Sequence, residues 1–168
     1  MTIVVREARP SDYAAIGEVT ALAYRSFVDA SGDQEYLAEL RDVARRAEAC
    51  PVYVAIDEPG GRVVGGAMYV PGPGTPFSEV EAAGEAGIRM VAVAPDAQGR
   101  GVGTALVKAL LARARADGRR GLVLLTSTSM TTAQRLYRRL GFRRVPERDW
   151  EVEPGFVLLC FAIDLTEA

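Results

Sequence analysis

The stretch from Ile88 to Leu106, IRMVAVAPDAQGRGVGTAL, limits the fold of this chain more than any other part of its sequence. It begins with apolar residues of the kind found in strands, stops at Pro95, and passes through three glycines at alternate positions into a helical pattern. Because glycine has no side chain to bury, glycines at this spacing let the backbone turn sharply and let another group approach it closely. The first amides of the following helix have no internal partner and lie at the positive end of its dipole. The stretch therefore predicts a strand, a turn and a helix whose N-terminus binds an anion.

Two familiar phosphate-binding motifs do not match these glycines. A Walker loop requires a lysine and then a serine or threonine after its last glycine, but here Thr104 follows Gly103 directly. A dinucleotide fingerprint requires a third glycine three positions after the second, and Leu106 occupies that position. A simple strand-to-helix turn without a ligand is the remaining alternative.

Composition limits the class of protein. The chain has 168 residues, 49% of them hydrophobic and 25% charged, which fits one soluble domain with a substantial core. Its net charge of −2 argues against nucleic acid as a partner. Cys50 and Cys160 stand apart from each other and are interpreted as reduced packing residues. The chain opens without a secretory leader pattern, and its longest apolar run, Phe156 to Ile163, is too short to cross a bilayer, so we expect a cytoplasmic protein without a membrane partner.

The sequence contains no histidine. Catalysis by Ser-His-Asp or Cys-His groups is therefore excluded, as is zinc held by histidine, and no metal site is predicted. Proton transfer must be carried out by Glu, Asp, Tyr, Lys, Cys or water.

The first half of the chain alternates strand and helix patterns. A strand over residues 2–6 precedes a helix with Ser11 as its N-cap. A second helix is expected from Ser31 to about Ala49, with Ser31-x-x-Gln34 as a capping box. Residues 51–70 then predict an antiparallel hairpin. Within it, Gly65 and Gly66 indicate either a bulge or a close approach by another backbone or a ligand.

The second half predicts a parallel βαβ unit made of residues 88–94, 102–116 and 121–126. A long irregular connection over residues 71–85 precedes it, as binding loops or mobile loops do. A further helix is expected over AQRLYRRL, residues 133–140, after a helix-start cluster in which Thr131-x-x-Gln134 can form a capping box, and two antiparallel strands close the chain. We therefore predict a single-domain α/β fold over residues 1–168, with a mixed sheet of about six to seven strands and about four helices.

Two sequence blocks resemble the GCN5-related N-acetyltransferase (GNAT) family. The spacing Gln98-x-x-Gly101-x-Gly103, after a strand that ends in Val-Ala-Pro, is similar to the pyrophosphate loop of that family. The block Ala133-x-x-x-Tyr137-x-x-x-Gly141-Phe142 is similar to the family's helix after the fifth strand, which carries a tyrosine and ends in Gly-Phe. The blocks occur in the family's order, and the resemblance extends over residues 52–165.

The resemblance implies acetyl-coenzyme A as co-substrate, bound where two central parallel strands splay apart at a bulge. Those strands would be residues 88–94 and 122–126. Backbone groups of Val91 and Val93 would pair with the pantetheine arm, and their amides are the candidate oxyanion donors. The residues that would hold the pyrophosphate are Gly99, Arg100, Gly101, Val102, Gly103 and Thr104, although Arg100 also fits a solvated loop arginine.

Tyr137 matches the position of the family's general acid. A phenol with a pKa of about 10 can protonate a departing thiolate, whereas the structural alternative is a packed aromatic ring. The general base is less clearly indicated. Glu85, just before the strand at 88–94, is the first candidate, and Glu79 and Glu81 on the adjoining loop are others. An apolar cleft would raise the pKa of such a carboxyl group toward neutrality, and a solvated acidic loop is the alternative.

Met130 departs from the family, in which an Asn is frequent at that position. A thioether cannot replace the donors and acceptors of an amide. Two functional hypotheses follow. The first is transfer of an acetyl group to a primary amine of a small molecule or peptide by direct attack on the thioester, and the acidic loop suits a cationic amine. The second is a non-catalytic module that binds or senses acyl-coenzyme A. Strand edges near the C-terminus favour a homodimer.

Overall fold

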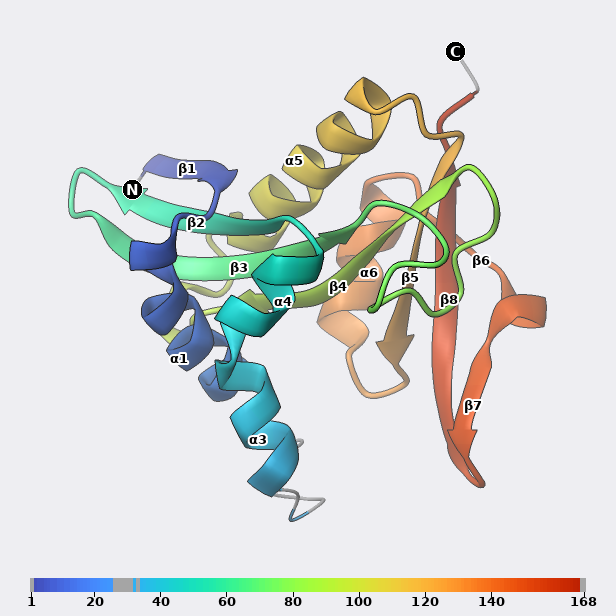
Figure 1. Ribbon diagram of the computed structural model, residues 1–168, viewed down its shortest axis with the longest axis horizontal. Helices are drawn as coiled ribbons and strands as arrows, with labels where there is room; N and C mark the ends of the chain where they lie inside the picture. The colour runs from blue at the N-terminus through green and yellow to red at the C-terminus, as the bar shows by residue number, and fades with distance from the viewer. Residues whose placement is uncertain (1, 26–31, 33, 167–168) are drawn as a thin grey trace. The chain divides into compact units, whose positions relative to one another are not determined.

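The computed structural model describes residues 2–25, 32 and 34–166. These residues contain eight strands and five α-helices and form two compact units (Figure 1). The first unit comprises Met1–Tyr69 and Met90–Ala109, and the second comprises Val70–Arg89 and Leu110–Ala168. Strand β4 (Glu85–Val93) and helix α5 (Val102–Ala116) each contribute residues to both units. The prediction of a single domain stays a prediction.

The first unit contains an antiparallel sheet of β1 (Thr2–Glu7), β2 (Val52–Glu58) and β3 (Arg62–Val70). The predicted hairpin is therefore confirmed. Its register shifts between Ala55 and Ile56, which pair with Gly65 and Val63, so Val64 of β3 is the bulged residue. The last residues of β4 follow β3 in this unit, where the Ala94 amide donates to the Val64 carbonyl at 2.8 Å.

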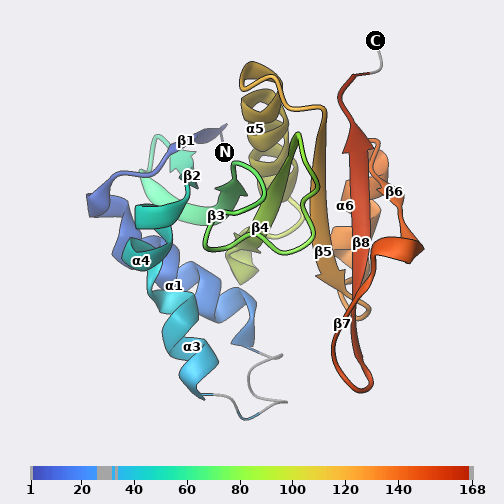
Figure 2. The ribbon, with the colours of Figure 1, turned by 45° about the vertical axis from the view of Figure 1, so that its right-hand side comes forward.

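The two glycines after the bulge let helices approach the sheet closely from opposite faces. A Cβ atom on Gly65 would lie 2.8 Å from the Ala92 carbonyl oxygen and 2.9 Å from Cγ1 of Val102, the first residue of α5. A Cβ atom on Gly66 would lie 2.8 Å from Cγ2 of Ile16 in α1 (Tyr13–Ala23). Successive strand residues point to opposite faces, so α5 covers one face and α1 the other (Figures 1 and 2). The predicted close approach at these glycines is confirmed.

The single helix predicted from Ser31 to Ala49 is wrong. The structure has α3 (Gln34–Arg41) and α4 (Val43–Ala49), separated at Asp42. The Asp42 carboxylate accepts a hydrogen bond from the Arg45 amide at 3.2 Å and so caps α4 instead of continuing α3. Ser31, the predicted N-cap, lies outside the described residues.

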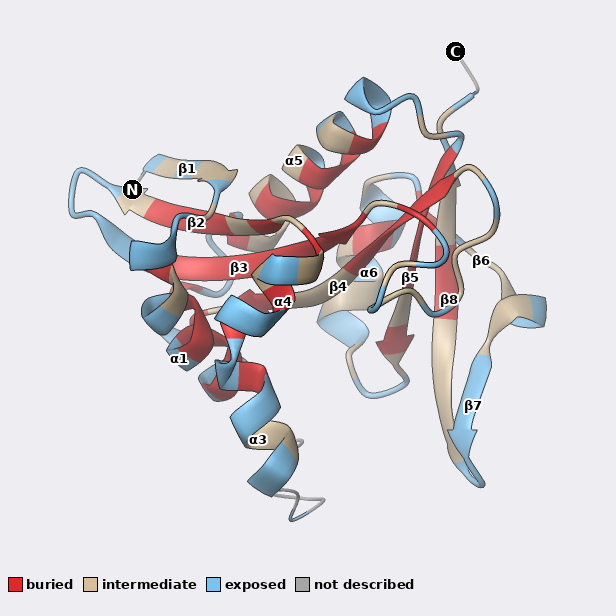
Figure 3. Ribbon diagram, in the orientation of Figure 1, coloured by how far each residue is buried: buried red, intermediate tan, exposed pale blue. Residues whose placement is uncertain are grey.

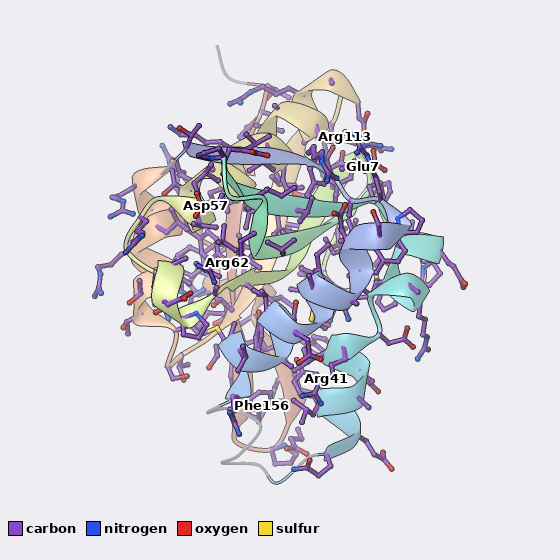
Figure 4. All side chains as sticks on the ribbon, turned by 90° about the vertical axis from the view of Figure 1, so that its left-hand side faces the viewer. Glu7, Arg41, Asp57, Arg62, Arg113 and Phe156 are labelled. Carbon is purple, nitrogen blue, oxygen red and sulfur yellow. The ribbon has the colours of Figure 1, made fainter. Side chains whose placement is uncertain are left out.

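Helix α1 packs against α3 through backbone as well as side chains. A Cβ atom on Gly17 would lie 2.6 Å from the Arg41 carbonyl oxygen. The Arg41 side chain, labelled in Figure 4, pairs with Glu18 at 3.0 Å. The predicted N-cap of α1 is also corrected: Ser11 belongs to the short helix η1 (Pro10–Asp12), and Asp12 precedes the first residue of α1.

The second unit contains a mixed sheet. Its strands pair in the order β4, β5 (Gly121–Ser127), β8 (Phe156–Asp164) and β6 (Arg143–Arg144), and β7 (Trp150–Glu153) also pairs with β8. The β4–β5 pair is parallel, which confirms the predicted βαβ unit, and the others are antiparallel. Strand β5 is largely buried whereas β7 is exposed (Figure 3). The strand number exceeds the prediction because the four-residue strand β7 was not predicted.

Helix α6 (Thr131–Arg139) starts at the residue predicted as its N-cap, before the predicted helix over residues 133–140, and lacks the predicted capping box. Met130 occupies the N-cap and makes no side-chain cap. The Gln134 amide instead donates to the Ser127 carbonyl at 3.0 Å and fixes the connection between β5 and α6. Among the described helices, none has both the length and the apolar character needed to cross a membrane.

Candidate active site

The glycine turn before α5 has the geometry of an anion cradle. Gly99 and Gly101 have φ values of 79° and 85°, where only glycine is free of strain. A Cβ atom on either would meet nothing within 4 Å. Glycine is therefore required here by the positive φ and not by lack of room, and the space in front of both residues is open. The first hydrogen bond of α5 runs from the Ala105 amide to the Gly101 carbonyl at 3.0 Å. The amides before Ala105 therefore have no acceptor in the helix.

Two contacts hold this cradle to the sheet of the first unit. Val102 is buried against the open face of Gly65. The short helix η2 (Pro95–Ala97) leads into the turn, and its Asp96 pairs with Arg62 of β3 at 3.2 Å. The cradle is thus formed by a fixed turn, and all six residues predicted for the pyrophosphate, from Gly99 to Thr104, lie in it.

Strand β4 changes conformation in its middle. The parallel ladder with β5 runs from Glu85↔Gly121 to Ile88↔Leu124. Met90, two residues later, has a φ of 56°, and no other non-glycine residue of the described chain has a positive φ. Such a conformation costs energy for a side-chain-bearing residue and occurs often at functional sites. The irregularity falls where the family resemblance places a bulge.

Val91 and Val93 follow Met90 and are half-buried, whereas Ala92 and Ala94 between and after them are buried. The Val91 carbonyl accepts a hydrogen bond from the hydroxyl of Tyr24, the residue after α1, at 3.1 Å. Sequence reasoning missed Tyr24, because its partner is 67 residues away in the chain.

Tyr137 lies in α6 with its ring buried. It packs against Phe142 and Phe161, with ring centroids 5.8 and 6.2 Å away. Among the described residues its hydroxyl has no hydrogen-bond partner, and the residue as a whole is 5% exposed. Burial raises the pKa of Tyr137 to about 12.

The raised pKa bears on the predicted role of Tyr137 as a proton donor, which stays a prediction. Proton transfer from a phenol with a pKa of about 12 to a thiolate with a pKa of about 8.5 is uphill by about 5 kcal/mol. A hydrogen bond from the phenol to the developing thiolate has no such cost. The hydroxyl therefore suits stabilisation of a leaving thiolate better than complete proton transfer.

Glu85 does not have the surroundings expected of a general base. It is the first residue of β4, and its buried carboxylate accepts hydrogen bonds from both terminal nitrogens of Arg148, at 2.6 and 3.0 Å, and from the Ala82 amide at 2.8 Å. Burial alone would raise the pKa of Glu85, but the bonds from Arg148 and Ala82 outweigh it, and the pKa lies below its usual value. The expectation of a raised pKa is wrong for Glu85.

The acidic loop is docked rather than solvated. The Glu79 carboxylate pairs with Arg89 of β4 at 2.9 Å, and Arg89 also donates to the Phe77 carbonyl at 3.1 Å. The Glu81 carboxylate accepts from the Glu79 amide at 2.6 Å. Burial raises the pKa of Glu79, partly opposed by Arg89. The pKa of Glu79 is therefore shifted in the direction that a base needs, whereas that of Glu85 is not.

Met130 stands beside the end of β5. The buried Thr126 hydroxyl points at the Met130 sulfur, 3.7 Å away, and sulfur is a weak acceptor. The thioether thus occupies the position where the family often has an amide.

A parallel strand pair with an anion cradle at the start of its crossover helix defines a class of proteins that bind a phosphorylated cofactor at that helix. The model of the Acetyltransferase (GNAT) family matches residues 16–142. The chain belongs to this family. It is an acetyl-coenzyme A-dependent N-acetyltransferase.

The chain is similar to proteins of known activity and to solved structures. It is 34% identical to an L-methionine sulfoximine/L-methionine sulfone acetyltransferase of Pseudomonas paraeruginosa, over 76% of this chain and 68% of that protein. It is 37% identical to the mycothiol acetyltransferase of Cellulomonas flavigena, over 64% of this chain but only 31% of that protein.

A GNAT acetyltransferase of Brucella melitensis, solved in complex with acetyl-coenzyme A, is 27% identical with a TM-score of 0.64, covering 98% of this chain and 88% of its own. A GCN5-related N-acetyltransferase of Kribbella flavida is 29% identical with a TM-score of 0.71, covering 97% of this chain and 98% of its own. These structures share the fold and, in the first, the co-substrate.

Proposed function

We propose that this N-acetyltransferase moves the acetyl group of acetyl-coenzyme A to the primary amine of a small molecule by direct attack on the thioester. The open glycine turn with unpaired amides at the start of α5 is the observation that carries the proposal. The relatives support a small-molecule acceptor, since one acts on L-methionine sulfoximine and L-methionine sulfone and another is a mycothiol acetyltransferase.

In this proposal the pyrophosphate is held by Gly99, Arg100, Gly101, Val102, Gly103 and Thr104. The amides supply directed hydrogen bonds, and the exposed Arg100 adds a positive charge. Val91 and Val93 present backbone groups of β4 to the pantetheine arm, and the Val91 amide meets the thioester oxygen as negative charge develops on it.

The amine nitrogen forms a bond to the thioester carbon, the carbon–sulfur bond breaks, and the amine loses a proton. Glu79 is the candidate proton acceptor, directly or through water, because its carboxylate is held beside β4 by Arg89 at 2.9 Å and burial raises its pKa. Tyr137 donates a hydrogen bond to the departing sulfur, which takes its proton from water.

Calorimetry with acetyl-coenzyme A tests the cradle. Gly101→Ala places a methyl group on a residue with a φ of 85°, and the matched control Gly118→Ala does so at 70°, after α5, where a Cβ atom is equally unobstructed. We expect Gly101→Ala to weaken acetyl-coenzyme A binding at least tenfold and Gly118→Ala to leave it within threefold, with similar losses of thermal stability. Equal affinities for the two variants would contradict the cradle.

Release of free thiol, followed with a panel of amines, tests the reaction. We expect turnover with amino acid derivatives, methionine sulfoximine among them, in preference to peptide N-termini. Binding of acetyl-coenzyme A without turnover of any amine would favour the non-catalytic module instead. A cytoplasmic location and a homodimer stay predictions.

A further inference from the structure

The hydrogen bond between Tyr24 and Val91 joins the end of α1 to the most irregular part of β4. Both residues belong to the first unit, and the Tyr24 hydroxyl lies 3.1 Å from the Val91 carbonyl oxygen. Val91 directly follows Met90, whose φ of 56° requires support from its surroundings. A side chain from a separate helix thus holds the peptide group that comes straight after the strained residue.

The hydrogen bond to the Val91 carbonyl places the Tyr24 hydroxyl on the same side of β4 as the Val91 amide. In a strand, the N–H and C=O groups of one residue point to the same side, as the paired bonds of antiparallel ladders show. The Tyr24 hydroxyl therefore lies at the edge of β4 toward which the Val91 amide is directed. A bond that fixes the Val91 carbonyl also limits rotation about the backbone of Val91. It therefore limits the direction in which the N–H bond of Val91 can point.

We infer that Tyr24 is a positioning residue for acetyl transfer: its hydroxyl holds Val91 so that the amide of Val91 meets the thioester oxygen. This rests on the proposed function, in which that amide stabilises the developing charge. Small errors of position have large effects on such a donor, because the stabilisation depends on a preorganised distance and angle.

Helix α1 has packing contacts that do not involve this hydroxyl. Helix α1 is already held by buried Ile16 and Val19 and by the close contact of Gly17 with the Arg41 backbone. Tyr24 is half-buried and follows the last residue of α1. Removal of its hydroxyl should therefore change the alignment of β4 and leave the helix in place.

Tyr24→Phe removes only the hydroxyl and tests the inference. Tyr13→Phe is the matched control, because it removes another half-buried phenol from α1, and the described contacts of Tyr13 include no bond to β4. We expect Tyr24→Phe to lower kcat between about fivefold and fiftyfold, with the dissociation constant of acetyl-coenzyme A within threefold of wild type. Tyr13→Phe should leave kcat within twofold. The carbonyl carbon resonance of Val91 should shift to lower frequency in Tyr24→Phe alone.

A fall in kcat of less than fivefold would overturn the inference, as would an unchanged Val91 resonance. A rise in the acetyl-coenzyme A dissociation constant that matches the fall in kcat would also overturn it, because it would assign Tyr24 to binding. The proposed function fails separately: in that case the wild-type protein itself shows no turnover with any amine.

Discussion

Glu85→Gln separates a structural ion pair from a catalytic base. Glu85 and Arg148 form a two-point pair in which the side chains are 8% and 26% exposed. Glutamine keeps the shape and one acceptor oxygen but leaves the guanidinium without its counter-charge. Full loss of one partner of a buried pair costs about 3–5 kcal/mol, and the partial exposure of Arg148 and the retained acceptor reduce this to about 1–3 kcal/mol. For a chain of this length the melting temperature should fall by about 3–10 °C.

The pH dependence of the unfolding free energy shows whether the Glu85–Arg148 pair stabilises the fold. The pKa of Glu85 is lower in the folded protein than in the unfolded chain, where it is about 4.3. The pair therefore stabilises the fold fully above the unfolded pKa and loses its contribution as the pH falls through the folded pKa. The difference in unfolding free energy between wild type and Glu85→Gln, measured in urea, should be constant above about pH 5.5 and shrink below about pH 4.

Glu18→Gln is the matched control for this variant. Glu18 pairs with Arg41 at the surface, where the side chains are 62% and 48% exposed, and its loss should cost under about 1 kcal/mol. At 25 °C, kcat of Glu85→Gln should stay within threefold of wild type. A hundredfold fall in kcat with an unchanged melting temperature would refute this reasoning and identify Glu85 as the base.

Three further predictions concern the site and the fold. Tyr137→Phe should lower kcat about tenfold to a thousandfold in a thiol-release assay, with acetyl-coenzyme A affinity by calorimetry little changed; an unaltered kcat would remove Tyr137 from the mechanism. The raised pKa of Glu79 means that a base at this position is active only above that pKa, so Glu79→Gln should abolish the acidic limb of the kcat/KM profile; survival of that limb would assign it elsewhere. Gly17→Ala, whose methyl carbon would lie 2.6 Å from the Arg41 carbonyl oxygen, should destabilise the fold by about 1–3 kcal/mol in urea unfolding, and a more stable variant would contradict the packing of α1 on α3.

The cradle was predictable from sequence because its cause is local. The positive φ values of Gly99 and Gly101 and the unpaired amides of α5 depend on neighbours within one turn of chain. The same holds for the β2–β3 hairpin, whose strands follow each other directly. The family and the co-substrate followed from the resemblance of two sequence blocks to the GNAT family, one of which contains this cradle.

The surroundings of the candidate acids and bases were not predictable in this way. Arg148 reaches Glu85 across 63 residues, and no spacing in the sequence indicates that pairing. The pKa of Glu85 was therefore expected to move in the wrong direction. The break at Asp42 was missed for a different reason: the apolar pattern continues through it, and only the bond to the Arg45 amide reveals a new N-cap.

Gly65 of β3 determines where the anion cradle lies, although it is not one of the residues proposed to bind the anion. Because Gly65 has no side chain, the first turn of α5 packs directly on the backbone of β3. This backbone contact sets the distance between the cradle and β4. Exposed residues of the turn, such as Gln98 and Arg100, can then diverge among relatives without displacing it. A methyl group at position 65 would push the first turn of α5 away from the sheet. The altered protein would keep every residue of the cradle but would hold these residues too far from β4.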